Sequence, residues 1–419
     1  PISAGTLERY LLLAEDVPGV TMRAVLEPSA DEPGALNLIA QVSRKPVSGL
    51  LTFDNRAFDQ TGPIEGLGVL DFNSFSSFGE KTEISWYHTF PNSQNFGQFS
   101  EEMFLGGSGL RLRVYAGTGL AIPVGGGSGG LSVFDYHGRT TVLGGVLTYP
   151  VIRSRAQTLN VYLSLDALES EILTNVASTA PLSRQSYDSL RVLRLGEDYA
   201  RSDIVFGGDH AAVNAVSLRV SHGLHALGAE ANDVNGGRLA PRTNEKTDFT
   251  KINFELSRTQ TLFSPWQGAS LALMGLVTGQ WSGDILPPAE QFYLGGSRFT
   301  RGYYAGQVAG DKALAATAEL QLNTSIDLSK LHLSKWHLPS DLATQFYVFY
   351  DWGETWQNST DISPVVVSSA GGGMRAQVTS HFELDLEALG RINRYPNGGP
   401  PSVSALNAIG LYWRVLGRF

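Results

Sequence analysis

The chain has 419 residues, no cysteine and 47 glycines, and its 31 basic residues are outnumbered by 40 acidic ones. Its 42% of apolar residues can bury a large core, which argues against disorder. The net charge of −9 argues against nucleic-acid binding, and the lack of cysteine excludes disulfides and thiolate chemistry. No apolar run reaches the ~18 residues of a transmembrane helix, which leaves a soluble β protein or a membrane β-barrel.

Residues 1–48 differ in pattern from the rest of the chain. Leu7, Leu11 and Ala14 follow helical spacing, and two short alternating segments come after them, at 20–26 and 36–42. The pattern predicts a helix followed by a hairpin. Such an α+β piece is too short for a whole domain, so we expect it to be the end of a domain that begins upstream.

From residue 49 onward, apolar and polar residues alternate almost everywhere. Ile84 and Trp86 oppose Glu83 and Ser85, for example, and the same alternation recurs in segment after segment. Strands of this kind have one face in an apolar medium and one in water. About sixteen such segments are expected, starting near residues 49, 66, 80, 96, 109, 139, 157, 188, 214, 249, 268, 312, 343, 364, 380 and 406.

The connections between these segments alternate between short and long, which is typical of outer-membrane barrels. An even number of strands closes the sheet and leaves no unpaired edge in lipid. A soluble sandwich or propeller is the alternative, but the charged fraction of 17% is low for one. The acidic row Glu383, Asp385 and Glu387 is expected to face a solvated lumen. We therefore predict an all-β membrane protein in which 49–419 form a sixteen-stranded antiparallel barrel.

Two motifs match patterns of catalytic or metal sites only weakly. The run 126–130 matches the G-x-S-x-G of serine hydrolases, but a nucleophile elbow must follow a strand and open a helix, so we interpret it as a flexible loop. His222 and His225 are three residues apart, which on a strand places them on opposite faces, so a shared metal is not expected. We expect no catalytic residue, metal or cofactor, and no enzyme activity.

One constellation is more specific. Arg301 lies in a long loop before the twelfth expected strand, whereas Glu319 and Asp351 lie on the twelfth and thirteenth. By alternation, both carboxylates face the lumen. If the loop folds back into the barrel, Arg301 can form a strong bidentate pair there. The alternative is that Arg301 is an ordinary exposed loop residue.

These features resemble the two-partner secretion transporters, the haemolysin secretion/activation proteins of the outer-membrane insertase and translocase superfamily. The resemblance is carried by the sixteen expected strands and by Thr300, Arg301, Gly302, Tyr303, the F-x-D-x-G of Phe349, Asp351 and Gly353, and the terminal Phe419. Family members usually have Val before the R-G-Y, so Thr300 is a departure.

The resemblance implies that Arg301, Gly302 and Tyr303 form a functional loop motif that folds inward and is clamped to Asp351. The further wall partners that it implies are Glu319, Phe349 and Gly353. It also implies that residues 1–48 are the C-terminal part of the last POTRA domain, ahead of the barrel at 49–419.

The function implied by the resemblance is export of an unfolded exoprotein, expected to be a large β-helical protein, through the barrel lumen. The implied location is the bacterial outer membrane, in contact with its lipids, with the N-terminal part in the periplasm. Two alternatives stay open at this point. One is an outer-membrane insertase of the same superfamily, and the other is a passive porin.

Overall fold

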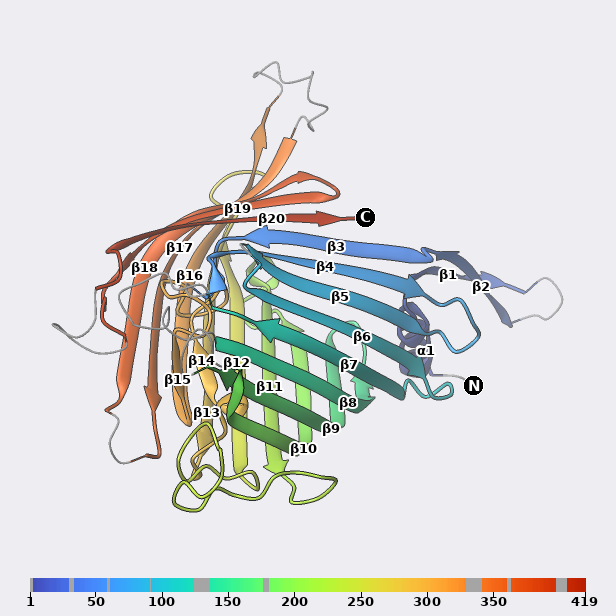
Figure 1. Cartoon of the computed structure of the whole chain (residues 1–419). Coiled ribbons are helices and arrows are strands. Elements are labelled where there is room, and N and C mark those ends of the chain that lie inside the picture. Colours follow the sequence, from blue (N-terminus) through green and yellow to red (C-terminus); the bar gives the residue numbers. More distant parts are fainter. Residues whose placement is uncertain are drawn as a thin grey trace.

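The structure is a computed structural model that describes residues 3–29, 34–58, 61–90, 92–123, 136–175, 181–328, 341–359, 363–396 and 405–419. Within these residues, sixteen strands form a closed antiparallel barrel in which each strand pairs with the next barrel strand (Figure 1). The barrel strands are β3 (Val47–Asp54), β4 (Ile64–Asn73), β5 (Lys81–Phe90), β6 (Gln94–Phe104), β7 (Arg111–Ala121), β8 (Tyr136–Arg153), β9 (Gln157–Thr174), β10 (Ser183–Asp203), β11 (Ala212–Gly223), β12 (Thr250–Phe263), β13 (Ser270–Ser282), β16 (Lys312–Asp327), β17 (Asp341–Trp356), β18 (Val365–Thr379), β19 (Phe382–Arg391) and β20 (Ile409–Arg418). The prediction of a sixteen-stranded barrel is confirmed.

The alternation in the sequence separates the outer face of the barrel from its lumen. In β5, Ile84 and Trp86 are about half exposed on the outer face. Glu83, which precedes them in the sequence, points the other way and pairs across the inner wall with Arg113 of β7 at 3.3 Å. Apolar side chains therefore face outward, and charged ones pair inside.

The barrel closes where β20 meets β3. The ladder between these two strands runs only from Arg414 opposite Asp54 to Arg418 opposite Leu50. The main chains of Gly49 and Phe419 extend it with two hydrogen bonds of 3.1 Å. We call this junction of β3 and β20 the closing seam.

The N-terminal piece consists of α1 (Ala4–Glu15) and a separate two-stranded sheet of β1 (Val20–Pro28) and β2 (Leu36–Arg44). It lies at one end of the barrel (Figure 1), where Arg153 pairs with Asp16 at 2.7 Å. No described helix is both long and apolar enough to cross a membrane. The assignment of this piece to a POTRA domain stays a prediction.

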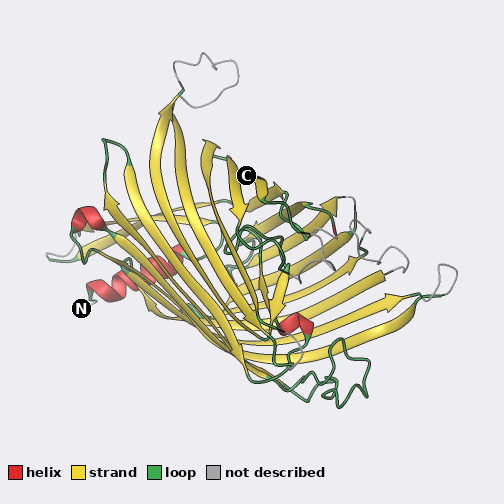
Figure 2. Cartoon of the chain, turned by 90° about the vertical axis from the view of Figure 1, so that its left-hand side faces the viewer, coloured by secondary structure: helices red, strands yellow, loops and turns green. Residues whose placement is uncertain are grey.

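The segment 283–311, between β13 and β16, is called the inward loop below. It contains the short helix η4 (Pro288–Glu290) and a hairpin of β14 (Phe292–Leu294) and β15 (Val308–Gly310). The hairpin packs in one buried cluster with Val367 of β18, and Figure 2 shows the sheet curving around it. The loop thus lies within the barrel rather than above it.

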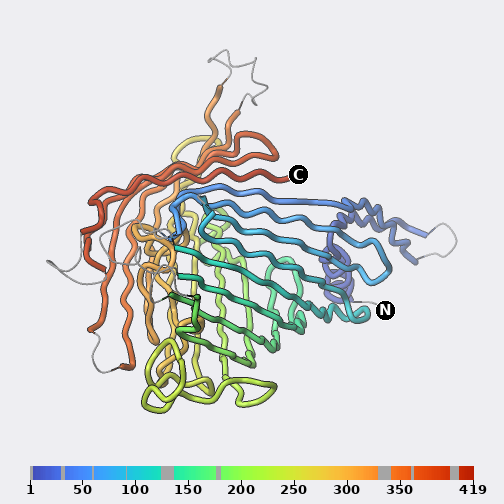
Figure 3. Tube along the Cα trace, in the orientation of Figure 1, coloured from blue at the N-terminus to red at the C-terminus, as the bar shows by residue number. Residues whose placement is uncertain are grey.

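A second long connection, 224–249 between β11 and β12, is called the surface loop. Because the strands alternate in direction, it leaves the barrel at the end opposite to the N-terminal piece, as Figure 3 shows. The η3 turn (Gly208–His210), between β10 and β11, lies at the same end of the barrel as the N-terminal piece.

Candidate functional site: the anchored inward loop

Arg301 of the inward loop makes a bidentate pair with a carboxylate of the barrel wall. Its Nε and Nη2 donate to the two oxygens of Asp351 at 3.0 Å each, and its backbone N–H donates to Asp351 Oδ2 at 2.8 Å. Nη1 donates to Glu319. Arg301 is 3% exposed and both carboxylates are 0% exposed. The whole cluster is therefore shielded from solvent.

Strand register explains why these wall groups meet. Asp351 of β17 lies opposite Thr317 of β16, and Phe349 lies opposite Glu319. All four side chains therefore share the inner face. The ring centroid of Phe349 also lies 3.6 Å from Arg301 Cζ, which adds a cation–π contact to the ion pair.

Arg375 of β18 balances the charge of this cluster. Its Nη1 donates to Glu319 Oε1 at 2.8 Å. Two guanidinium groups therefore face the two carboxylates Glu319 and Asp351. Buried charges are tolerated when they are paired and hydrogen-bonded, and here no charge is left over.

The rest of the R-G-Y motif fixes the loop backbone against the wall. Tyr303 is 1% exposed, and its hydroxyl donates to the carbonyl oxygen of Asn393 at 2.6 Å. At Gly302, a Cβ would lie 2.6 Å from Ser369 Cβ, so only glycine fits this close approach.

Gly353 completes the set, because a Cβ there would lie 2.8 Å from Thr300 Cγ2. The seven residues singled out in the sequence thus lie together, although their functional role stays a prediction.

Two further arginines, which sequence reasoning missed, hold the carbonyl groups of the loop. Arg391 donates to the carbonyl oxygen of Gly302, and Arg56 donates to that of Arg301 at 2.9 Å. Arg56 also pairs with Glu387 at 2.5 Å. Glu387 faces the lumen as expected, but the expectation that it is solvated is wrong, because it is 7% exposed and also accepts a hydrogen bond from Tyr347 at 2.9 Å.

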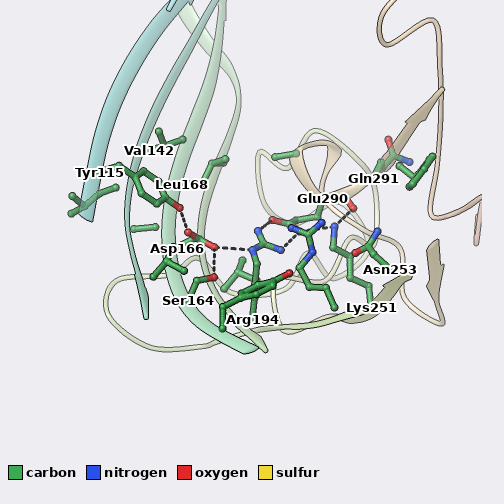
Figure 4. Close-up of a pocket in the computed structure, with 18 of the residues that line it drawn as sticks. Tyr115, Val142, Ser164, Asp166, Leu168, Arg194, Lys251, Asn253, Glu290 and Gln291 are labelled. Atoms are coloured by element: carbon green, nitrogen blue, oxygen red, sulfur yellow. Dashed lines mark hydrogen bonds and ion pairs between the residues drawn. The ribbon is translucent and has the colours of Figure 1, made fainter. Parts of the chain in front are cut away.

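The base of the inward loop has a second ionic anchor on another part of the wall, formed by β9, β10 and β12 and shown in Figure 4. Glu290 accepts both terminal nitrogens of Arg194 at 2.6 and 3.1 Å, and it pairs with Lys251 Nζ at 2.7 Å. Arg194 also donates to Asp166 at 2.7 Å. This cluster borders a cavity of about 740 Å³ between the loop and the wall of the barrel, which Arg219 also lines.

The surface loop is docked on the inward loop through Arg242. Its Nη1 lies 2.6 Å from Asp311 and 2.5 Å from the carbonyl oxygen of Leu286. Within the surface loop, Glu245 is fully buried. Burial and the neighbouring Asp188 carboxylate raise its pKa, against the opposing effect of Arg238.

The remaining sequence motifs lie apart from the anchored loop. The prediction that His222 and His225 share a strand is wrong, because β11 ends at Gly223 and His225 lies in the surface loop. Among the described residues, no group of three or more His, Asp or Glu side chains could hold a metal. The run 126–130 lies outside the described residues.

The chain is a closed sixteen-stranded antiparallel barrel that holds an anchored loop in its lumen. Its fold is similar to that of CdiB from Escherichia coli, with a TM-score of 0.75 and 17% identity over 97% of this chain and 69% of that chain. CdiB from Acinetobacter baumannii is also similar, with a TM-score of 0.71 and 17% identity over 100% and 69% of the two chains. BamA from Haemophilus ducreyi lacking POTRA domains 1–3 has a TM-score of 0.60 and 13% identity over 100% and 78%.

A comparison of the sequence with protein families identifies the family of the chain. The chain belongs to the haemolysin secretion/activation protein family ShlB/FhaC/HecB, whose model matches residues 127–376, more than half of its length. No curated protein sequence matches the chain. The resemblance to two-partner secretion transporters is confirmed, and the family is one of transporters rather than a class of enzymes.

Proposed function

We propose that the protein exports an unfolded secreted protein through its barrel lumen, and that the inward loop held by Arg301 and Asp351 is its functional segment. The observation that carries this proposal is the burial of the Arg301 cluster inside a closed barrel. A fully paired internal arginine is costly to assemble, because each charge must lose its hydration. Such an arrangement is expected where a loop must be held at one position.

The lumen suits the binding of an extended chain. Arg219 of β11 is exposed to the cavity beside the loop and has no ion-pair partner among the residues that the structure describes. Asn253 and Gln280 line the same cavity and offer hydrogen-bonding groups. An unfolded polypeptide needs such partners for its backbone and polar side chains once it leaves bulk water. The proposed step is therefore binding and conduction, not chemistry.

The partner and the location follow from the same proposal. The exported partner is a secreted exoprotein of large β-helical type, which would fold after release. The barrel lies in the bacterial outer membrane among its lipids. The N-terminal piece, taken as the C-terminal part of a POTRA domain at 1–48, faces the periplasm and receives the exoprotein there.

Insertion of other barrels is the second candidate function. It is favoured by the short ladder of the closing seam, because a short ladder costs less to open toward the membrane than a long one. A passive porin is disfavoured, because the chain belongs to a family of secretion transporters.

Export of the cognate exoprotein tests the proposal. The full-length protein and its Arg301→Ala variant are produced with the exoprotein, and surface-exposed exoprotein is measured. We expect export with the wild type and a strong loss with the variant, at equal amounts of inserted barrel. If removal of the protein instead lowers the amounts of other outer-membrane barrels and leaves the exoprotein unaffected, the insertase is correct.

A further inference from the structure

Arg56 lies two residues beyond the end of β3 and turns into the lumen, with its side chain 10% exposed. Its Nη1 donates to the carbonyl oxygens of Gly296 at 3.2 Å and Arg301 at 2.9 Å. Its own carbonyl oxygen accepts a hydrogen bond of 3.2 Å from the N–H of Ala305. Three hydrogen bonds therefore join Arg56 to the inward loop.

The other side of the same guanidinium binds the last two strands of the barrel. Nη2 lies 2.5 Å from Glu387 of β19, and Cζ lies 4.0 Å from the ring centroid of Tyr412 of β20. Tyr412 also accepts a hydrogen bond of 2.7 Å from Arg391, which holds the carbonyl oxygen of Gly302. Arg56 thus joins the end of the first barrel strand to the last two strands from inside the lumen.

The backbone ladder of the closing seam is absent where Arg56 lies. Among the described residues, the β3–β20 ladder ends at Asp54 and Arg414. Beyond it, Asn55 makes the next contacts through its side chain, donating to the carbonyl oxygen of Leu411 at 3.0 Å and accepting from the N–H of Trp413 at 2.9 Å. Side chains of residues 55 and 56 therefore replace the ladder at this end of the seam.

We propose that Arg56 is a positioning residue that couples the place of the inward loop to the closure of the barrel between β3 and β20. The inference rests on the proposed function only in taking the inward loop as the functional segment. With the loop in place, its carbonyl groups hold the guanidinium against Glu387 and Tyr412. When the loop withdraws, Arg56 loses two acceptors and the link across the seam weakens. Coupling of this kind is reciprocal, so loss of the contacts that Arg56 makes with Glu387 and Tyr412 also loosens its hold on the loop.

The planar fork of arginine is what the site requires. One guanidinium serves two carbonyl groups, a carboxylate and an aromatic face at the same time, which the single ammonium group of lysine cannot do. Arg56→Lys should therefore keep the charge opposite Glu387 but lose much of the hold on the loop.

The absence of native cysteine allows a clean reporter of loop position. Val367 of β18 is fully buried under the inward loop, so Val367→Cys in the purified full-length protein should react with a water-soluble maleimide only when the loop withdraws. Arg56→Ala should raise the labelling rate about tenfold, as expected for the loss of charge-assisted hydrogen bonds. It should also lower the transition temperature, which is the temperature at which the barrel unfolds and no longer migrates as a compact band in a gel.

Arg414→Ala is the matched control. Arg414 lies on β20 in register with Asp54 and pairs with Glu383 and Asp385, but it makes no hydrogen bond or ion pair with the inward loop in the described part of the chain. This control should lower the transition temperature and leave the thiol introduced at position 367 protected. Arg56→Lys should have a higher transition temperature than Arg56→Ala, while its labelling remains fast. If Arg56→Ala does not fold, Arg56→Lys alone tests the proposal.

Coupling is measured by combining Arg56→Ala with Arg301→Ala. Arg301→Ala should lower the transition temperature more in the presence of Arg56 than in its absence, because only part of its effect passes through Arg56. The proposal is overturned if both Arg56 variants leave the thiol at position 367 protected, or if Arg301→Ala lowers the temperature equally in both backgrounds. Neither assay contains exoprotein, so these outcomes are independent of whether the protein exports one.

Discussion

At the scale of single residues, the Arg301–Asp351 pair is expected to act as one unit. Breaking a desolvated pair costs ~3–5 kcal/mol, against ~1 kcal/mol for an exposed one, and both partners here are buried. Arg301→Ala and Asp351→Ala should each reduce export strongly, and the double variant should be little worse than either. Fully additive losses of exported protein would contradict the clamp.

The control for this series is Arg298→Ala. Arg298 lies in the same loop and pairs with Glu255, but its side chain is 65% exposed. Its removal should change export by less than a factor of about five, in keeping with the ~1 kcal/mol or less of an exposed pair.

Glu245 gives the surface loop a pH dependence. Because its pKa in the folded loop is raised above the ordinary 4.5, folding favours the protonated form. The stability that this group contributes is complete at pH values below about 4.5 and is lost as the pH rises through the elevated pKa. We therefore expect the ratio of two protease cleavage rates, that of the wild-type surface loop to that of Glu245→Gln, to increase as the pH rises. A ratio of cleavage rates that stays constant with pH would contradict the assignment.

At the scale of elements, the sixteen strands could be predicted because alternation is a local property of the sequence. The inward orientation of Glu319 and Asp351 could be predicted for the same reason, because it follows from the alternation within each strand. Arg375 lies on the polar face of an expected strand, so alternation also offered a signal for it.

Arg56 and Glu290 offered no such signal. Both lie outside the regular part of a barrel strand, and their partners are far away in the sequence. Their contacts depend on the path of the inward loop across the lumen, which no periodicity encodes.

The closing seam provides a test at this scale. A Cβ on Gly49 would lie 2.2 Å from the ring of Phe419, whereas a Cβ on Gly97 of β6 would meet nothing within 4 Å. The exposed Phe419 ring can turn away from the added methyl group, so Gly49→Ala should destabilise the barrel by less than the ~1–3 kcal/mol of overpacking in a closed core, and Gly97→Ala should destabilise it less still. The transition temperature in gel-mobility assays measures this, and equal effects of the two substitutions would show that the seam tolerates the added methyl group.

At the scale of the whole molecule, the inward loop has ionic anchors on two walls of the lumen, and the cavity between the loop and the wall is the proposed path of the exported chain. Arg219 lies in this cavity, whereas its neighbour Val220 is 40% exposed on the outer face. The two adjacent positions therefore report on the lumen and on the lipid-facing surface of one strand. Leu411, 70% exposed beside the closing seam, reports on the site where an insertase would contact its client.

The most direct measurement places a photo-crosslinking amino acid at each of these three positions during export of the cognate exoprotein. Transport through the lumen predicts a crosslink from position 219 and none from positions 220 and 411. A crosslink from position 411 without one from position 219 would contradict export through the barrel.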